Sequence, residues 1–149
     1  MPQTSSPGQL SAEAITTLRQ AAATAARNAY APYSHFYVGA AVLLETGECI
    51  TGCNVENASY RLTTCAEQAA IARAVAERGP AIRIVAVAVA NADSSLACQP
   101  CGACRQTIAE FAAPECHIFY PGDGGKPGTC TLADLLPASF NAASLPTNC

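Results

Sequence analysis

The sequence predicts an α/β fold, a three-layer α/β/α sandwich with a five-stranded mixed sheet. Strand-length apolar runs alternate with alanine-rich segments of helical periodicity, and Gly and Pro punctuate the joins. The run 82–90 carries Ile and Val on both faces, as a central strand covered by helices on two sides would. The 149 residues leave room for one domain, expected over 10–149 after a flexible tail at 1–9.

The first third of the chain predicts a helix and a hairpin. Residues 10–30 place Leu and Ala at helical spacing, Ser11 is suited to cap the start, and Pro32 ends the segment. The runs 38–44 and 48–55 resemble strands and are joined by a Glu-Thr-Gly turn.

The remaining elements follow in alternation. A threonine at 63 or 64 can cap a second helix that Gly79-Pro80 ends, and Pro100 precedes a third. The expected helices and strands are helix 63–78, strand 82–90, helix 101–112, strand 116–120, strand 129–132 and a helical turn at 134–136.

Composition narrows the function classes. Half of the residues are hydrophobic and 13% are charged, so we expect part of the apolar excess to cover a subunit interface, although an alanine-rich core needing no partner is an alternative. The net charge is −3 and the eight Lys and Arg are scattered, which disfavours binding to long DNA or RNA and favours a small uncharged substrate. No stretch approaches the ~18 apolar residues of a membrane span.

Nine cysteines do not predict a disulfide framework here. Their number is odd, and the first eight residues lack the apolar stretch of a signal peptide, so we expect a cytoplasmic, reducing location. Six of them are expected to be free thiols, mostly small buried apolar groups: Cys49, Cys53, Cys98, Cys116, Cys130 and Cys149.

The other three cysteines form the most informative pattern in the chain. Cys65-Ala66-Glu67 is followed by Pro100-Cys101-Gly102-Ala103-Cys104, a pattern typical of zinc deaminases that act on nucleobases. Three thiolates leave the fourth tetrahedral position of zinc open for water. Two alternatives remain: Cys98 could close a structural site, or Cys101 and Cys104 could be a redox pair.

Both ligand groups fall at expected helix N-termini, where free N–H groups favour thiolate. Three thiolates on Zn²⁺ leave a charge of −1, and Arg105 beside Cys104 is expected to offset it, unless it is a solvated helix residue. Glu67 is expected to move protons while a zinc-activated hydroxide attacks the amino-bearing ring carbon, the alternative being a first-turn glutamate placed for the helix dipole.

Two further segments are suited to hold a base and its sugar. Phe36 lies in an aromatic cluster before the first strand and could stack on a pyrimidine, or be part of the core. Asn54 and Glu56 occupy alternate positions after the second strand and could bind sugar hydroxyls, or belong to an ordinary polar surface loop.

Together these residues resemble the small, zinc-dependent, homotetrameric cytidine deaminases over about 12–140. The stretches that carry the resemblance are 32–41 (PYSHFYVGAA), 52–60 (GCNVENASY), 64–67 (TCAE), 100–106 (PCGACRQ) and 135–140 (LLPASF). The resemblance implies hydrolytic deamination of cytidine and deoxycytidine to uridine and deoxyuridine with release of ammonia, as in pyrimidine salvage.

It also implies one zinc per subunit on Cys65, Cys101 and Cys104, with Glu67 as the proton shuttle. The homotetramer would complete each site with residues of neighbouring subunits. The substrate-contacting positions would be Phe36, Asn54, Glu56, Ala58, Tyr60, Ala66 and Phe140.

Three positions depart from the family pattern. Gln68 replaces an arginine that would reduce the negative charge of the thiolates, Arg61 replaces a glycine, and Asn141-Ala142 replaces Gly-Pro. The rival functions are a deaminase of another aminopyrimidine such as blasticidin S, which the Asn54 and Glu56 pair disfavours, and a zinc-binding interaction module without catalysis.

Overall fold

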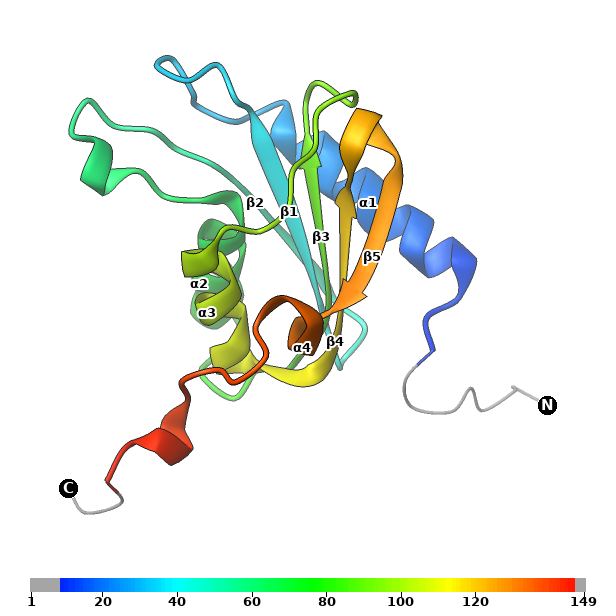
Figure 1. Ribbon diagram of the computed structural model, residues 1–149, viewed down its shortest axis with the longest axis vertical. Coiled ribbons are helices and arrows are strands. Elements are labelled where there is room, and N and C mark those ends of the chain that lie inside the picture. The colour runs from blue at the N-terminus through cyan, green and yellow to red at the C-terminus, as the bar shows by residue number, and fades with distance from the viewer. Residues whose placement is uncertain (1–8, 147–149) are drawn as a thin grey trace.

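A five-stranded mixed sheet with the order β2-β1-β3-β4-β5 forms the middle layer of the protein, as the sequence predicts (Figure 1). The structure is a computed structural model that describes residues 9–146. Strands β3 and β4 are parallel and the other neighbours are antiparallel. The strands are β1 Val38–Leu44, β2 Cys49–Cys53, β3 Ile84–Asn91, β4 Ala112–Pro121 and β5 Pro127–Thr131.

Helices cover both faces of this sheet. Helix α1 (Ala12–Ala26) packs on one face, and α2 (Ala66–Arg78), α3 (Gly102–Phe111) and the short α4 (Leu132–Leu135) pack on the other. Three 3₁₀ turns complete the set: η1 Tyr60–Leu62, η2 Asp123–Gly125 and η3 Ala142–Ser144.

The β1–β2 hairpin is in close contact with a helix on each side. Gly39 pairs with Cys53, and a Cβ on Gly39 would lie 2.0 Å from the backbone oxygen of Ala22 in α1. The next pair, Ala40 and Gly52, faces α2, and a Cβ on Gly52 would lie 2.4 Å from the backbone nitrogen of Ala70. The two glycines therefore let both helices approach the sheet backbone directly.

The hydrophobic core has two parts, one on each face of the sheet. Alternate β1 residues Val38, Ala40 and Val42 join the larger cluster with α2 and α3, whereas Ala41 joins the smaller cluster under α1. On the α1 side, Arg19 lies 5.2 Å from the centre of the Phe119 ring and donates to the carbonyl of Gly128, 2.8 Å away. This contact ties α1 to the far half of the sheet.

Several predicted boundaries are wrong. Helix α2 is capped by Cys65 rather than by Thr63 or Thr64, β2 ends at Cys53 rather than at 55, and the last helical turn spans Leu132–Leu135 rather than 134–136. The two largest differences are at the end of α1 and at the start of β4. The first helix ends at Ala26 rather than at 30, because Tyr30 forms a bridge beside Val55, donating to Asn54 O and accepting from Glu56 N. Strand β4 begins at Ala112, directly after α3, instead of at 116. In both places sheet pairing offers the backbone groups partners that the helical pattern cannot indicate.

The described cysteines are all free thiols, but they are less buried than predicted. Cys98 and Cys116 are buried, Cys53 and Cys130 are half-buried and Cys49 is exposed. The predicted tail at 1–9 and Cys149 fall almost wholly outside the described residues, so these expectations stay predictions.

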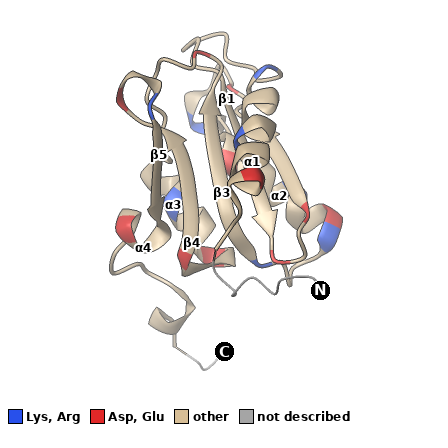
Figure 2. Ribbon diagram, turned by 90° about the vertical axis from the view of Figure 1, so that its right-hand side faces the viewer, with Lys and Arg blue, Asp and Glu red and all other residues tan. Residues whose placement is uncertain are grey.

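Charge and hydropathy add two findings. The Lys and Arg positions are spread over separate elements, with no cluster along the face that Figure 2 shows. Within residues 9–146, the helices are all too short or too polar to cross a membrane.

Gly52→Ala is expected to lower the free energy of unfolding by roughly 1–3 kcal/mol, because its methyl would overlap the α2 backbone, which cannot turn aside as a side chain does. Urea denaturation measures the change. Gly122→Ala is the matched control, since its Cβ would meet nothing closer than 3.4 Å and its φ is −86°. Equal stability of Gly52→Ala and wild type would contradict the packing described.

Candidate active site

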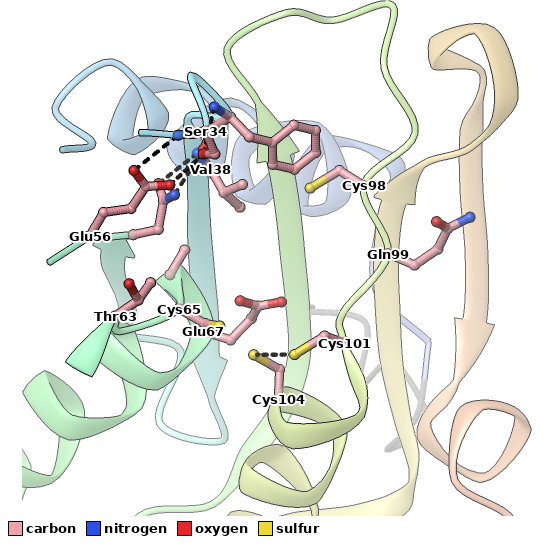
Figure 3. A pocket seen from close by; sticks show the side chains of 13 residues that line it. Ser34, Val38, Glu56, Thr63, Cys65, Glu67, Cys98, Gln99, Cys101 and Cys104 are labelled. Carbon is pink, nitrogen blue, oxygen red and sulfur yellow. Dashed lines mark hydrogen bonds between the residues drawn. The ribbon is translucent and has the colours of Figure 1, made fainter. Parts of the chain in front are cut away.

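A cavity of about 290 Å³ opens where the N-termini of α2 and α3 meet the ends of β1 and β2 (Figure 3). It unites eight of the residues that the sequence analysis singled out: Phe36, Asn54, Glu56, Cys65, Ala66, Glu67, Cys101 and Cys104. The chain therefore brings its predicted metal ligands, its predicted proton carrier and four of its seven predicted substrate contacts to a single concave site.

The three thiols converge because two helices start at the same place. Cys65 is the N-cap of α2, Cys101 is the N-cap of α3, and Cys104 lies in the first turn of α3. Their sulfurs all lie within 4.8 Å of one another, and those of Cys101 and Cys104 are 3.6 Å apart. Tetrahedral zinc with Zn–S bonds of about 2.3 Å separates its sulfurs by about 3.8 Å, so the spacing fits a three-thiolate zinc site.

The spacing of the three sulfurs also indicates whether the fourth coordination position of a zinc ion would be open. Cys98 lines the cavity but is not part of the three-sulfur cluster. Burial raises the pKa of its thiol to about 12. The spacing of the sulfurs thus favours an open three-cysteine site over the closed four-cysteine alternative.

The sulfurs already share protons in the protein alone. A hydrogen bond from Cys104 lowers the pKa of Cys65 to about 7, against the opposing effect of burial. The same hydrogen bond, together with burial, raises the pKa of Cys104. Of these two thiols, Cys65 is therefore the one that ionises first.

Glu67 is a buried carboxyl group beside these sulfurs. It is 4% exposed, lies in the first turn of α2 and points toward the space above Cys101 and Cys104 (Figure 3). Burial raises its pKa, more than hydrogen bonds lower it. A glutamate placed only for the helix dipole would be solvated, whereas this one is buried beside the sulfurs with a raised pKa, as suits a group that takes up and releases protons.

The predicted sugar contacts line the same cavity and also anchor the segment before β1. The Asn54 amide oxygen accepts from Val38 N and its nitrogen donates to Phe36 O, both at 2.8 Å. Glu56 Oε2 accepts from Tyr33 N at 2.9 Å and from Ser34 N at 3.2 Å. The polar segment after β2 is therefore not an ordinary surface loop, and its anchoring role was not predicted.

Phe36 is 36% exposed and belongs to neither hydrophobic cluster, so it is available to a ligand rather than part of the core. Three other predicted contacts do not line this cavity. Tyr60 and Phe140 are 74% and 61% exposed, and Ala58 is exposed too.

Gln68 and Arg105 both hold backbone near the sulfurs. Gln68 Oε1 accepts from Cys65 N at 3.3 Å, which fixes the first turn of α2. Arg105 Nε donates to Pro100 O at 2.8 Å, and its Nη1 donates to Leu135 O at 3.1 Å. Arg105 thus braces the segment that leads into Cys101, and its predicted effect on the charge of the zinc site stays a prediction.

Sequence reasoning missed four cavity residues, Ser34, Val38, Thr63 and Gln99, and considered a fifth, Cys98, only as the fourth ligand of a closed site. Ser34 stands in the aromatic cluster that was singled out, and Cys98-Gln99 directly precedes Pro100, so closeness to a motif was the available signal. Val38 lies in the same stretch, 32–41, that carries the family resemblance, but its apolar side chain indicates only a place in the first strand.

The comparisons with known proteins agree with this geometry. The model of the cytidine and deoxycytidylate deaminase zinc-binding region matches residues 12–120. A cytidine deaminase of Halalkalibacterium halodurans is 42% identical over 121 residues, which are 81% of this chain and 89% of that relative. A blasticidin-S deaminase of Bacillus cereus is 35% identical over 109 residues, 70% of this chain and 76% of that protein.

A solved structure shares the fold of this chain. The crystal structure of cytidine deaminase from Mycobacterium tuberculosis superposes with a TM-score of 0.75 and 42% identity, covering 85% of this chain and 96% of that one. The family model includes the segments that bear Cys65, Glu67, Cys101 and Cys104. With three sulfurs at zinc spacing and a buried glutamate beside them, the chain belongs to the cytidine and deoxycytidylate deaminase family.

Proposed function

We propose that this protein hydrolyses cytidine and deoxycytidine to uridine and deoxyuridine, releasing ammonia. The observation that carries the proposal is the joint placement, in one cavity, of three sulfurs at zinc spacing, a buried carboxyl group and the polar pair Asn54 and Glu56. The curated relatives named above at 42% identity and the matching fold support it.

Cys65, Cys101 and Cys104 would hold one Zn²⁺ per chain. When bound, zinc supplies a water whose pKa is lowered from 15.7 toward about 7, and so a nucleophile at neutral pH. The two helix N-termini favour the thiolate forms of these ligands.

Glu67 performs the proton transfers. It accepts a proton from the attacking water and delivers it to N3 of the ring as the oxygen adds to C4. It then takes the proton of the new C4 hydroxyl and delivers it to the amino group, so that the C4–N bond breaks, C4=O forms and ammonia leaves. Its burial beside the sulfurs raises its pKa, which favours the uptake of a proton from water.

The remaining residues orient the nucleoside. Phe36 packs against the base, and Ala66 at the start of α2 lines the cavity beside it. Asn54 and Glu56 bind the sugar hydroxyls with the hydrogen-bonding capacity that their anchoring contacts leave, since the Asn54 amide offers a second N–H and Glu56 Oε1 a second lone pair.

The electrostatic balance of the site depends on Gln68 and Arg105. A neutral glutamine leaves the thiolates more negative than an arginine would, so the positive charge of Arg105 and the helix dipoles carry more of the compensation. The cytoplasmic location expected from the sequence is part of this proposal too.

Neighbouring subunits complete the sites of a homotetramer. Tyr60, Leu62 and Phe140 are large apolar side chains that one chain leaves 61–74% exposed. The loop that carries η1 and the segment that carries Phe140 both extend from the body of the domain (Figure 1). Ala58, Tyr60 and Phe140 would then contact substrate in a neighbouring site, which accounts for their distance from their own cavity.

Cytidine and deoxycytidine are expected to be deaminated efficiently, and free cytosine, CMP and blasticidin S poorly. Asn54 and Glu56 contribute only when a sugar is present, and a 5′-phosphate would face Glu56 and a chain of net charge −3. The loss of ultraviolet absorbance on mixing with each compound gives the rates. Preference for blasticidin S would instead assign the protein to the activity of the Bacillus cereus relative.

Two matched variants separate the roles of metal and carboxylate. Cys101→Ala should lose both zinc and activity, because two thiolates hold zinc poorly. Glu67→Gln should keep about one zinc per chain while turnover falls by ~10⁴-fold or more, since general acid–base catalysis supplies ~10²–10⁴-fold and one carboxyl serves several transfers here. Metal analysis and single-substrate kinetics provide the readouts. A zinc-binding module without catalysis would be inactive both as wild type and as Glu67→Gln. Substantial activity in Glu67→Gln would contradict the role assigned to Glu67.

Light scattering on an active sample should give four times the single-chain mass of 15.2 kDa. Dilution that dissociates the assembly should lower the rate per chain, because Tyr60 and Phe140 would leave the sites that they complete. A fully active monomer would refute the shared sites.

A further inference from the structure

The hydroxyl of Ser34 connects two residues of the proposed substrate site. It donates to Glu56 Oε1 in a short hydrogen bond and accepts from Phe36 N at 3.0 Å (Figure 3). Ser34, Phe36 and Glu56 all line the cavity. One small polar group therefore bridges the residue proposed for the base and a residue proposed for the sugar.

The backbone between these partners adopts a demanding conformation. His35 has a φ of 56°, in the left-handed region that non-glycine residues rarely occupy, and its N–H donates to Ala31 O at 3.0 Å. Such a conformation persists only where surrounding contacts hold it. Here the contacts include the backbone N–H groups of Tyr33 and Ser34, both bound to Glu56 Oε2.

The two oxygens of Glu56 thus have different roles. Oε2 accepts two backbone N–H groups, which fill its two lone pairs, while Oε1 accepts from the Ser34 hydroxyl. The free lone pair that a ligand could use is on Oε1. The direction of this lone pair depends on how the carboxylate group of Glu56 is rotated. The hydrogen bond from the Ser34 hydroxyl to Oε1 fixes that rotation.

We propose that Ser34 is a positioning residue for nucleoside binding, which aims Glu56 Oε1 at a sugar hydroxyl and holds Phe36 at a fixed place against the base. This inference rests on the proposed function in one respect, namely that Glu56 binds the sugar. Ser34 does not touch the reacting atoms and acts through Glu56 and Phe36.

The charge state of Glu56 agrees with this role. The Ser34 hydrogen bond is the largest of the influences that lower the pKa of Glu56, ahead of the two backbone N–H groups and the nearby His35. An ionised carboxylate is an acceptor only, so a sugar hydroxyl that meets Oε1 must donate its proton. This fixes the orientation of the hydroxyl as well as its position.

Ser34→Ala tests the inference without disturbing the backbone anchor, because its N–H still binds Oε2 and the side chain is exposed. We expect KM for cytidine and Kd for uridine, measured by calorimetry, to rise about 5- to 20-fold, the scale of one hydrogen bond to a charged group. The value of kcat should stay within about twofold, because Glu67 and the thiols do not contact Ser34. Ser34→Thr, which keeps the hydroxyl, should restore both constants.

Ser95→Ala is the matched control. Ser95 makes the same pair of contacts to a carboxylate, donating from its hydroxyl to Asp93 Oδ1 at 2.7 Å and from its N–H at 3.0 Å, but it does not line the cavity. The kinetic constants of Ser95→Ala should match those of wild type. An equal rise of KM in Ser95→Ala would show a general effect of losing such a contact and overturn the inference.

A double-mutant cycle with Glu56→Ala distinguishes action through Glu56 from an independent effect. Adding Ser34→Ala to Glu56→Ala should raise KM by much less than it does in wild type. Additive effects, an unchanged Ser34→Ala, or a loss confined to kcat would each overturn the positioning role while leaving the proposed function intact. Wild type that neither turns over cytidine nor binds uridine would instead overturn the proposed function, and the inference with it.

Discussion

The approach of two helix N-termini to one point is the constraint on which the rest of the structure depends. Three sulfurs within 4.8 Å of one another repel as thiolates, so the chain must hold them in place through elements that cannot drift apart. Gly52 sets α2 directly against β2, and Arg105 braces the start of α3 through Pro100 O and Leu135 O. The cavity inherits its shape from these contacts.

Much of this arrangement could be predicted from the sequence because its signals are local. The spacing of Cys65, Glu67, Cys101 and Cys104 specifies a chemistry, and alternation of apolar runs specifies the layers. The boundary at Ala26 could not be predicted, since Tyr30 leaves the helix for backbone partners around Val55 that lie far along the chain. The same is true of Ser34, whose importance depends on Glu56 lying opposite it in space.

Asn54 and Glu56 show how a binding site can share residues with the scaffold. Each side chain anchors the segment before β1 and also faces the cavity. Sequence analysis predicted that these two residues bind a sugar, because a buried strand does not explain polar residues at these positions. In the structure, part of their hydrogen-bonding capacity is used by backbone groups of Phe36 and Val38. Substitution of either residue therefore changes substrate contacts and loop geometry together, and kinetic constants alone cannot divide the two.

The position of the ligands along the chain has a consequence for folding. Between Cys65 and Cys101 lie α2, the central strand β3 and the loop that leads to Pro100. An ion bound at both ends would close this segment into a ring. Because it would bind the folded arrangement of the three sulfurs, its binding free energy would add to the free energy of unfolding. Strand β3 pairs with β1 on its antiparallel side and with β4 on its parallel side. The ring would therefore include the strand that links the two halves of the sheet. A metal bound to these three sulfurs would therefore stabilise the folded arrangement of α2, β3 and α3 together.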